Sequence, residues 1–292
     1  MSNKDNQIDM RIKETSDSQE LFHSLKSILS EVWDAEEAIS IAFILLEHHY
    51  KWTRSHVITR EPIPPTDLSL LIKDVHRLLN QEPVQYVIGK AAFMGMELEV
   101  NSEVLIPRPE TEELVALIAE NHPEAKSIID LGTGSGCIPI GLKKLLPKTE
   151  ITAMDVSGTA LEVAKRNAIN EKVDINFYQA DVLKEHGVEK AKFDIIVSNP
   201  PYVLKSEEEE MKIHVIDYEP AVALFVPDDS PLIFYERIAQ IAKDQLTAGG
   251  VLYFEINERF GIDTAQLCEH VGFTKTQVVK DFNGKDRFVT AQ

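Results

Sequence analysis

The feature that most constrains the fold is the regular alternation of strand-like and helix-like segments after residue 126. Short apolar, β-branched runs at Ser127–Leu131, Ile151–Asp155 and Phe193–Ser198 are separated by helical patterns such as Gly158–Asn170. Strands that are separated by helices of about 10–15 residues are joined by right-handed crossovers, which gives a mainly parallel sheet and an α/β domain. Further strands are expected at Ile175–Ala180, Val251–Ile256 and Thr276–Val279, and further helices at Ile138–Leu145 and Leu232–Leu246.

The first 106 residues show a different pattern. Apolar residues recur at three- and four-residue spacing from Leu21 to Leu29, from Ile39 to Leu46 and from Leu70 to Leu79, which is typical of helices. The residues before them are polar and aperiodic, as in a disordered lead-in. The predicted organisation is a disordered lead-in at 1–18, a helical domain at 19–82, a linker or β-hairpin at 83–106 and an α/β catalytic domain at 107–292.

Composition excludes several classes of protein. The chain has 30 basic and 48 acidic residues, a net charge of −18, and a field of that sign repels nucleic-acid backbones. No apolar run is long enough to span a membrane. The two cysteines, Cys137 and Cys268, form neither a disulfide framework nor a CxxC metal site, which favours a reducing cytosol. Neighbouring His48 and His49 are expected to point to different faces of a helix, and we predict no metal site.

A glycine-rich loop follows the strand at Ser127–Leu131. The segment Asp130–Gly136 reads DLGTGSG, so its backbone can turn tightly and a ligand can approach its amides. The dinucleotide fingerprint G-x-G-x-x-G would need a third glycine at position 137 or 139, where this chain has cysteine and proline. The observed G-x-G-x-G after an acid resembles the loop of S-adenosylmethionine-dependent methyltransferases.

Two further acids end strand-like segments. Asp155 lies 23 residues after Gly132, at a place where a carboxylate can accept both hydroxyls of a ribose. It could instead cap the helix that follows. Asp181, with the amide of Val182, suits the amino group and ring of an adenine. The alternative for Asp181 is a turn aspartate, because aspartate is common after strands.

The most specific motif is Asn199–Tyr202, which reads Asn-Pro-Pro-Tyr at the end of a buried strand. The nitrogen of an amide or an exocyclic amine has its lone pair delocalised into a π system, so methyl transfer requires that the lone pair be aimed. The side-chain oxygen of Asn199 and the carbonyl of Pro200 can each accept one N–H and orient that nitrogen. Tyr202 offers an aromatic face to a flat group. The motif predicts a planar NH2 substrate and leaves open a glutamine amide, an adenine amine or a guanine amine.

From about residue 20 to its C-terminus the chain resembles the release-factor glutamine methyltransferase family of the HemK type. The segment Leu105–Glu112, which reads LIPRPETE, is more specific to that family than the glycines are. Other matching motifs are Pro83–Gly89, Phe93–Gly95, the glycine loop, Asn199–Tyr202, Tyr218–Pro220 and Asp286–Phe288.

The resemblance implies a Rossmann-like methyltransferase domain with a mainly parallel seven-stranded sheet, preceded by a small helical domain that helps dock the substrate. It implies transfer of a methyl group from S-adenosyl-L-methionine to the glutamine of the Gly-Gly-Gln motif in class 1 peptide-chain release factors, in the cytoplasm. The implied catalytic residues are Asn199 and Pro200, and Pro201 and Tyr202 join them in binding the substrate. The implied cofactor residues are Gly132, Thr133, Gly134, Ser135, Gly136, Asp155, Asp181, Val182 and Asn199.

Two other functions compete with this hypothesis. A DNA or RNA exocyclic-amine methyltransferase is expected to carry a basic surface or a target-recognition domain, and this chain shows neither in its sequence. A non-catalytic cofactor-binding adaptor would tolerate loss of Asn199 or the prolines, and all of them are present. We expect a monomer without a nucleic-acid partner. Arg108 could contact the substrate or pair with an acid.

Overall fold

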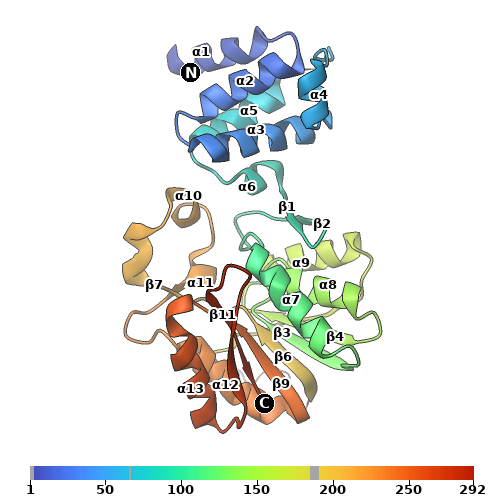
Figure 1. Cartoon of the computed structure of the whole chain (residues 1–292), viewed down its shortest axis with the longest axis vertical. Coiled ribbons are helices and arrows are strands. Elements are labelled where there is room, and N and C mark those ends of the chain that lie inside the picture. The colour runs from blue at the N-terminus through green and yellow to red at the C-terminus, as the bar shows by residue number, and fades with distance from the viewer. Residues whose placement is uncertain (1–2, 66, 185–190) are drawn as a thin grey trace. The chain divides into compact units, whose positions relative to one another are not determined.

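The computed structural model describes residues 3–65, 67–184 and 191–292, and it divides into two compact units (Figure 1). The helical unit consists of residues 1–89 and 212–218. The catalytic unit consists of residues 90–211 and 219–292. The chain therefore leaves the catalytic unit after Met211 and returns to it at Glu219.

Caps and buried apolar faces define the helical unit. Asp17 and Asp34 each accept two backbone N–H groups at the start of a helix, as N-cap residues do. The apolar faces meet in one core in which Leu21, Leu25 and Leu45 are fully buried. The helices are α1 (Asn3–Lys13), α2 (Ser18–Leu29), α3 (Ala35–Tyr50), α4 (Arg54–Thr59), α5 (Ser69–Leu79), α6 (Val84–Ile88) and α10 (Ile213–Ile216).

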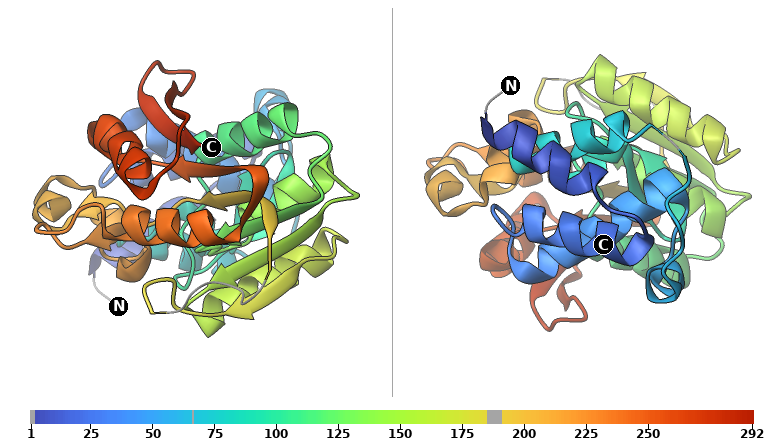
Figure 2. Two further views of the ribbon diagram at one scale, coloured as in Figure 1. Left: turned by 90° about the horizontal axis from the view of Figure 1, so that it is seen from below. Right: turned by 90° about the horizontal axis from the view of Figure 1, so that it is seen from above.

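The prediction of a disordered lead-in at 1–18 is wrong for helix α1. Ile8 and Ile12 are buried against the rest of the unit, and His76 and Asp9 are joined at 2.9 Å. The right-hand view of Figure 2 shows this helix in dark blue, and its contacts are with α2 and α5. Two apolar residues four positions apart are too short a pattern to stand out among polar neighbours, so tertiary packing decides this segment.

The connection between the units is a helix followed by a hairpin. Strands β1 (Lys90–Phe93) and β2 (Met96–Glu99) pair antiparallel, in agreement with the hairpin expected within 83–106. The first residues of that range instead form α6, because Pro83 stands at its N-cap and Gly89 ends it with a left-handed backbone, φ 73°.

The catalytic unit contains the predicted α/β fold with a seven-stranded sheet in the order β10-β11-β9-β6-β3-β4-β5. The five strands from β9 to β5 are parallel. At one edge β11 pairs antiparallel with β9, and β10 pairs antiparallel with β11. The strands are β3 (Ser127–Leu131), β4 (Glu150–Asp155), β5 (Asn176–Gln179), β6 (Phe193–Ser198), β9 (Leu246–Glu255), β10 (Thr276–Lys280) and β11 (Asp286–Ala291).

Two apolar cores cover the two faces of the sheet. One packs α7 and α8 against it, and the other packs α12 and α13. The long helices are α7 (Pro109–Asn121), α8 (Cys137–Leu145), α9 (Gly158–Asn170), α12 (Ile233–Gln245) and α13 (Gly261–Val271). The short elements are β7 (Val203–Leu204), a 3-10 turn at Lys205–Glu210, α11 (Ala221–Leu224), β8 (Phe225–Val226) and a 3-10 turn at Glu258–Phe260. The sequence pattern does not predict α13 or β11.

The strand order reverses beside β3. From β3 the chain proceeds to β4 and β5 on one side, whereas β6 and β9 lie on the other side. Open α/β sheets bind their ligands at such a reversal, outside the carboxyl ends of the strands. The hydroxyl of Ser198 at the end of β6 donates to the carbonyl of Leu131 at the end of β3, at 2.5 Å, and fixes the two strand ends side by side.

The burial of α1 generates a prediction about stability. Ile12→Ala should lower the free energy of unfolding by about 2–5 kcal/mol, because it leaves a cavity where a fully buried side chain packs. Met10→Ala is the matched control, since Met10 is 56% exposed on the same helix. Urea unfolding followed by circular dichroism measures both. Equal stability of the two variants would show that α1 does not belong to the core.

Candidate active site

A cavity of about 260 Å³ opens at the carboxyl ends of β3, β4 and β6 in the catalytic unit. Most of the sequence-predicted site residues line it together, although they come from separate segments of the chain. The two that do not line it are Gly136 and Tyr202. Those that do are Gly132, Thr133, Gly134, Ser135, Asp155, Asp181, Val182, Asn199, Pro200 and Pro201.

The glycine loop has the backbone that its sequence requires. Gly132, Gly134 and Gly136 all have positive φ, at 85°, 52° and 81°. A Cβ added at Gly132 or Gly134 would meet no protein atom within 4 Å, whereas one added at Gly136 would lie 3.0 Å from the Cβ of Ala164. The first two glycines therefore leave room for a ligand, and Gly136 permits close packing of the helix that follows.

Asp155 stabilises this loop from the end of β4. One carboxylate oxygen accepts the N–H of Gly134 at 2.8 Å, and the other accepts the N–H of Ser157 at 2.9 Å. Burial raises the pKa of Asp155, and these backbone hydrogen bonds oppose that rise. Each oxygen retains a second lone pair, so the carboxylate can hold the loop and still accept hydroxyl groups from a ligand in the cavity.

Asp130 is a buried acid beneath the loop. It is fully buried, and neither of its carboxylate oxygens has a hydrogen-bond partner in the described part of the chain. Burial raises the pKa of Asp130 to about 7. A buried carboxylate without a partner is costly and favours positive charge nearby, so the loop suits a cationic ligand.

Asp181 and Val182, which follow β5 closely, lie on the cavity wall. Asp181 forms a turn, because its carboxylate accepts the N–H of Leu183 and pairs with Lys184 at 2.9 Å. The hydrogen bond from Lys184 lowers the pKa of Asp181. The carbonyl of Val182 accepts from Arg237 at 3.2 Å. The turn interpretation of Asp181 is thus correct, and its contact with an adenine stays a prediction.

Asn199 stands at the end of β6 with its side chain tied to two residues behind it. Its Nδ2 donates to the hydroxyl of Thr111 at 3.5 Å, and that hydroxyl donates to Glu255 at 2.7 Å. Burial raises the pKa of Glu255 to about 7, although hydrogen bonds from Thr111 and Asn199 and the charge of Arg287 oppose the rise. The nitrogen of the Asn199 amide is therefore engaged on the side of Thr111.

Tyr202 occupies a different place from the other three residues of its motif. Its ring packs against the core of α12 and α13, and burial raises its pKa. Asn257 donates to its carbonyl oxygen at 3.5 Å. Tyr202 holds the motif against the sheet, and its contact with a substrate stays a prediction.

Arg108 pairs with an acid, one of the two alternatives left open by the sequence. Its Nη2 lies 2.6 Å from Glu219, which is 5% exposed and also accepts the N–H of Ile106 at 3.2 Å. Arg108 lines the cavity as well. The pair connects two of the family-like motifs, Leu105–Glu112 and Tyr218–Pro220, at the cavity wall.

Thr111 and Glu255 are site residues that the sequence reasoning missed. Thr111 lies within the LIPRPETE segment, so that motif indicates the segment that contains it. Nothing in the pattern distinguishes this threonine from its neighbours as a site residue. Glu255 ends the long strand β9, as Asp155 ends β4. An acid at the carboxyl end of a parallel strand is the signal that could have found it.

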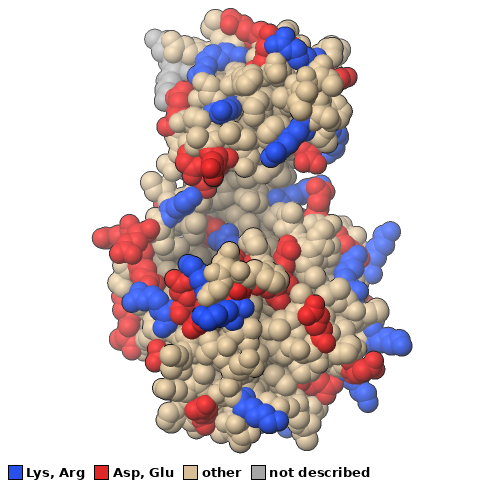
Figure 3. Space-filling view, in the orientation of Figure 1, with Lys and Arg blue, Asp and Glu red and all other residues tan. Residues whose placement is uncertain are grey.

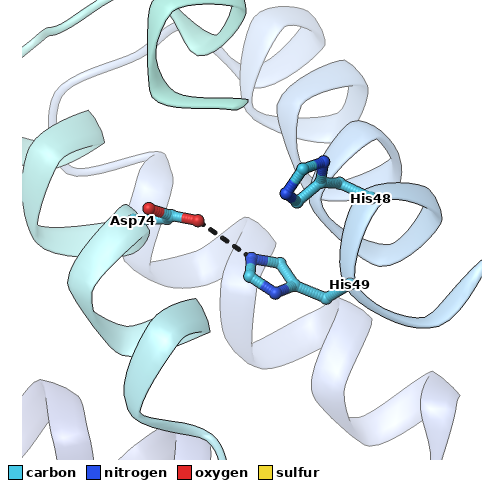
Figure 4. Close-up of side chains that lie close together, drawn as sticks. All are labelled: His48, His49 and Asp74. Carbon is cyan, nitrogen blue, oxygen red and sulfur yellow. Dashed lines mark hydrogen bonds and ion pairs between the residues drawn. The ribbon is translucent and has the colours of Figure 1, made fainter. Parts of the chain in front are cut away.

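The helical unit holds one cluster of possible metal ligands among the described residues (Figure 4). The ligand atoms of His48, His49 and Asp74 lie within 4.8 Å of one another, and His49 is joined to Asp74 at 3.0 Å. The two rings meet edge to face, so the expectation that they diverge is wrong. Arg77 lies 3.9 Å from Asp74, which disfavours a cation there. The predicted absence of a metal stays a prediction.

The residues of the cavity fit S-adenosyl-L-methionine. The open glycines leave space against backbone amides, and Asp155 offers lone pairs to hydroxyls. Asp130, buried beneath the loop, provides negative charge for a sulfonium and an ammonium when it is ionised. Residues 108–220 match the methyltransferase small domain, and residues 20–89 match the PrmC N-terminal domain. The fold and the site together define an S-adenosylmethionine-dependent methyltransferase.

Curated relatives identify the family. The chain is 48% identical to a release factor glutamine methyltransferase of Bacteroides thetaiotaomicron over 74% of this chain and 78% of the relative. It is 40% identical to one of Flavobacterium psychrophilum over 89% and 94%. The chain belongs to the release factor glutamine methyltransferase family, as its sequence motifs predict.

Among solved structures, the fold is similar to a methyltransferase from Pyrococcus furiosus, with a TM-score of 0.51 and 18% identity over 74% of this chain and 95% of that one. The catalytic domain of human Mettl16 gives a TM-score of 0.54 with 16% identity over 68% and 74%. At these identities the likeness supports the fold alone.

The buried Asp130 predicts a pH dependence of stability. Because its pKa is raised above 3.8 in the folded chain, folding binds a proton, and the free energy of unfolding falls as pH rises from about 4 to about 7. Asp130→Asn removes this contribution, so the stability of the variant relative to the wild type should increase with pH in that window and level off above it.

Urea unfolding at pH 5, 6, 7 and 8 measures this difference. Asp181→Asn is the control, because a carboxyl with a lowered pKa is ionised in both states over this range and should give a constant difference. A constant difference for Asp130→Asn as well would contradict the raised pKa.

Proposed function

We propose that this chain transfers a methyl group from S-adenosyl-L-methionine to the side-chain amide nitrogen of the glutamine in the Gly-Gly-Gln motif of class 1 peptide-chain release factors, as a monomer in the cytoplasm. Family membership supports the reaction. The observation that carries the proposal is the presence of Asn199 and Pro200 in the same cavity as the glycine loop. No helix in the described residues has the length and apolarity needed to cross a membrane.

The loop and its acids hold the cofactor. When bound, S-adenosyl-L-methionine supplies an electrophilic methyl group on a positively charged sulfur. Gly132 and Gly134 allow close approach to backbone amides, and Asp155 keeps the loop in shape through the N–H of Gly134. When Asp130 is ionised, its charge lies in a low-dielectric interior, where its attraction for a cation is stronger than it would be in water.

The end of β6 orients the nucleophile. The Asn199 side-chain oxygen and the Pro200 carbonyl each accept one N–H of the glutamine amide, which turns the nitrogen lone pair out of the amide π system toward the transfer direction. These acceptors also stabilise the positive charge that develops on nitrogen. No general base is required before transfer, because the nitrogen becomes acidic only once it carries the methyl group.

Charge disfavours the nucleic-acid alternative. A protein that binds nucleic acid carries a basic stripe or patch. This chain has a net charge of −18, and on the face drawn in Figure 3 its basic side chains are interspersed with acidic ones. The same planar NH2 chemistry therefore favours a protein glutamine over a base.

The helical unit is proposed to dock the release factor. It includes residues 212–218, which follow the transfer motif by only a few residues in the chain. Lys212 pairs with Glu37 at 2.8 Å, and the hydroxyl of Tyr218 donates to the carbonyl of Asn80 at 2.7 Å. The polypeptide that follows the transfer motif is therefore held in the helical unit. Binding of the release factor to the helical unit then positions the residues that follow the motif.

Exposed apolar side chains of the helical unit test the docking role. Ile58 is 77% exposed and Leu70 is 65% exposed, so Ile58→Ser with Leu70→Ser should raise the KM for whole release factor by about tenfold, with kcat unchanged. The KM for a short Gly-Gly-Gln peptide should stay the same. Ile169→Ser is the control, because Ile169 is 74% exposed on the catalytic unit. An unchanged KM for whole release factor would remove these side chains from the docking surface.

Asn199 tests the reaction itself. Asn199→Ala removes an acceptor that orients the nucleophile, so single-turnover methylation should slow by about 10²–10³. Asn199→Asp keeps an acceptor and should lie between Ala and wild type. Mass spectrometry of the Gly-Gly-Gln peptide, taken from whole release factor after incubation with enzyme and cofactor, identifies the product. A folded Asn199→Ala that transfers methyl at the wild-type rate would show that Asn199 does not orient the nucleophile.

A further inference from the structure

Three side chains from distant parts of the sequence form a hydrogen-bonded group at the cavity wall. Glu255 ends β9, Thr111 lies in the first turn of α7, and Asn199 follows β6. Glu255 is 1% exposed and Thr111 is 2% exposed, and Thr111 and Asn199 both line the cavity. The hydroxyl of Thr111 lies 2.7 Å from Glu255 and 3.5 Å from the Nδ2 of Asn199, and a hydrogen bond from Asn199 also reaches Glu255.

The donor and acceptor properties of these groups fix the direction of the hydrogen bonds between them. An ionised carboxylate only accepts hydrogen bonds, and a hydroxyl has one proton to donate. Because the proton of Thr111 is donated to Glu255, only the lone pairs of that hydroxyl remain for Asn199. They can accept from the amide nitrogen of Asn199 and not from its oxygen, so the amide nitrogen is directed at Thr111.

We propose that Thr111 and Glu255 are positioning residues that hold the Asn199 carboxamide with its oxygen, rather than its nitrogen, toward the substrate. This rests on the proposed function, in which that oxygen accepts an N–H of the substrate amide. A carboxamide turned by 180° has nearly the same shape but presents two donors to a substrate that also presents donors. Thr111 and Glu255 therefore favour a substrate NH2 group through the orientation that they give to Asn199.

The geometry also explains why the residue that accepts the proton of Thr111, Glu255, is an acid. A serine, threonine or amide in the place of Glu255 could donate to Thr111, which would free the proton of Thr111 for the oxygen of Asn199 and permit the reversed orientation. Arg287 favours the charged form of Glu255. At pH 8, above the pKa of about 7, the carboxylate is ionised and accepts only.

The first test compares Thr111→Val with Thr111→Ser at pH 8, with saturating cofactor and whole release factor. Valine has the shape of threonine without its hydroxyl, so kcat should fall by about 10–100-fold, as when a supporting residue of a site is lost. Serine retains the hydroxyl and should keep kcat within about threefold of the wild type. Cofactor affinity, measured by calorimetry, should be the same in all three, and equal kcat for valine and wild type would overturn the proposal.

A double-mutant cycle separates positioning from general structural support. If Thr111 acts through Asn199, Thr111→Val should cause no further loss of kcat in an Asn199→Ala background. If the double variant instead lost kcat by the product of the two single-variant factors, Thr111 would act by another route, and the proposal would be contradicted.

A further variant and a spectroscopic measurement keep the positioning role testable if Thr111→Val misfolds or if the proposed function is wrong. Glu255→Leu fills the site with an apolar group of similar size, and it should lower kcat like Thr111→Val because the Thr111 proton becomes available to Asn199.

Hydrogen exchange of the Asn199 side-chain NH2 can be followed by NMR without any measurement of enzyme activity. Its signal is assigned by its absence in Asn199→Ala. Exchange should be slow in the wild type and Thr111→Ser and at least about tenfold faster in Thr111→Val and Glu255→Leu. Equal exchange rates would overturn the positioning role even if release factor proved not to be the substrate.

Discussion

The site depends on the reversal of strand order between β3 and β6. Because these two parallel strands are neighbours, their carboxyl ends meet at one edge of the sheet although 67 residues separate Leu131 from Ser198. The hydrogen bond between those two residues fixes the ends at a common height. The glycine loop that follows β3 and the Asn-Pro-Pro-Tyr motif that follows β6 are thereby held against the same cavity, as methyl transfer requires.

Buried carboxyl groups at strand ends organise the same edge of the sheet. Asp130 on β3, Asp155 on β4 and Glu255 on β9 all lie where parallel strands end, and burial raises the pKa of each. Their hydrogen-bonding differs. Asp155 holds backbone amides of the loop, Glu255 holds the hydroxyl of Thr111, and Asp130 has no partner among the described residues. The first two acids preorganise polar groups and the third favours a cation, so acids at strand ends serve two purposes.

How much the sequence predicts depends on how local each signal is. The strands β3 and β6 and helix α9 follow from residue pattern alone, and the glycine loop and Asn199 follow from motifs whose chemistry requires those residue types. Helix α1 was missed because its stability comes from two side chains, Ile8 and Ile12, packed against distant helices.

Within the site, the pairing of Thr111 with Glu255 could not be predicted from sequence, because 144 residues separate them and only the folded sheet joins them. Tyr202 also shows the influence of packing. Its contact with a substrate stays a prediction, and the structure packs its ring against the core of α12 and α13. Motifs thus predict which segment carries the chemistry, whereas the direction of each side chain depends on tertiary packing.

The most direct measurement is a crystal structure of the chain with S-adenosyl-L-homocysteine and a peptide that contains the Gly-Gly-Gln motif. The account predicts that the glutamine amide nitrogen lies within hydrogen-bond distance of both the side-chain oxygen of Asn199 and the carbonyl oxygen of Pro200, and that it faces the sulfur of the cofactor product. A glutamine bound elsewhere, or an Asn199 amide whose nitrogen faces the glutamine nitrogen, would contradict it.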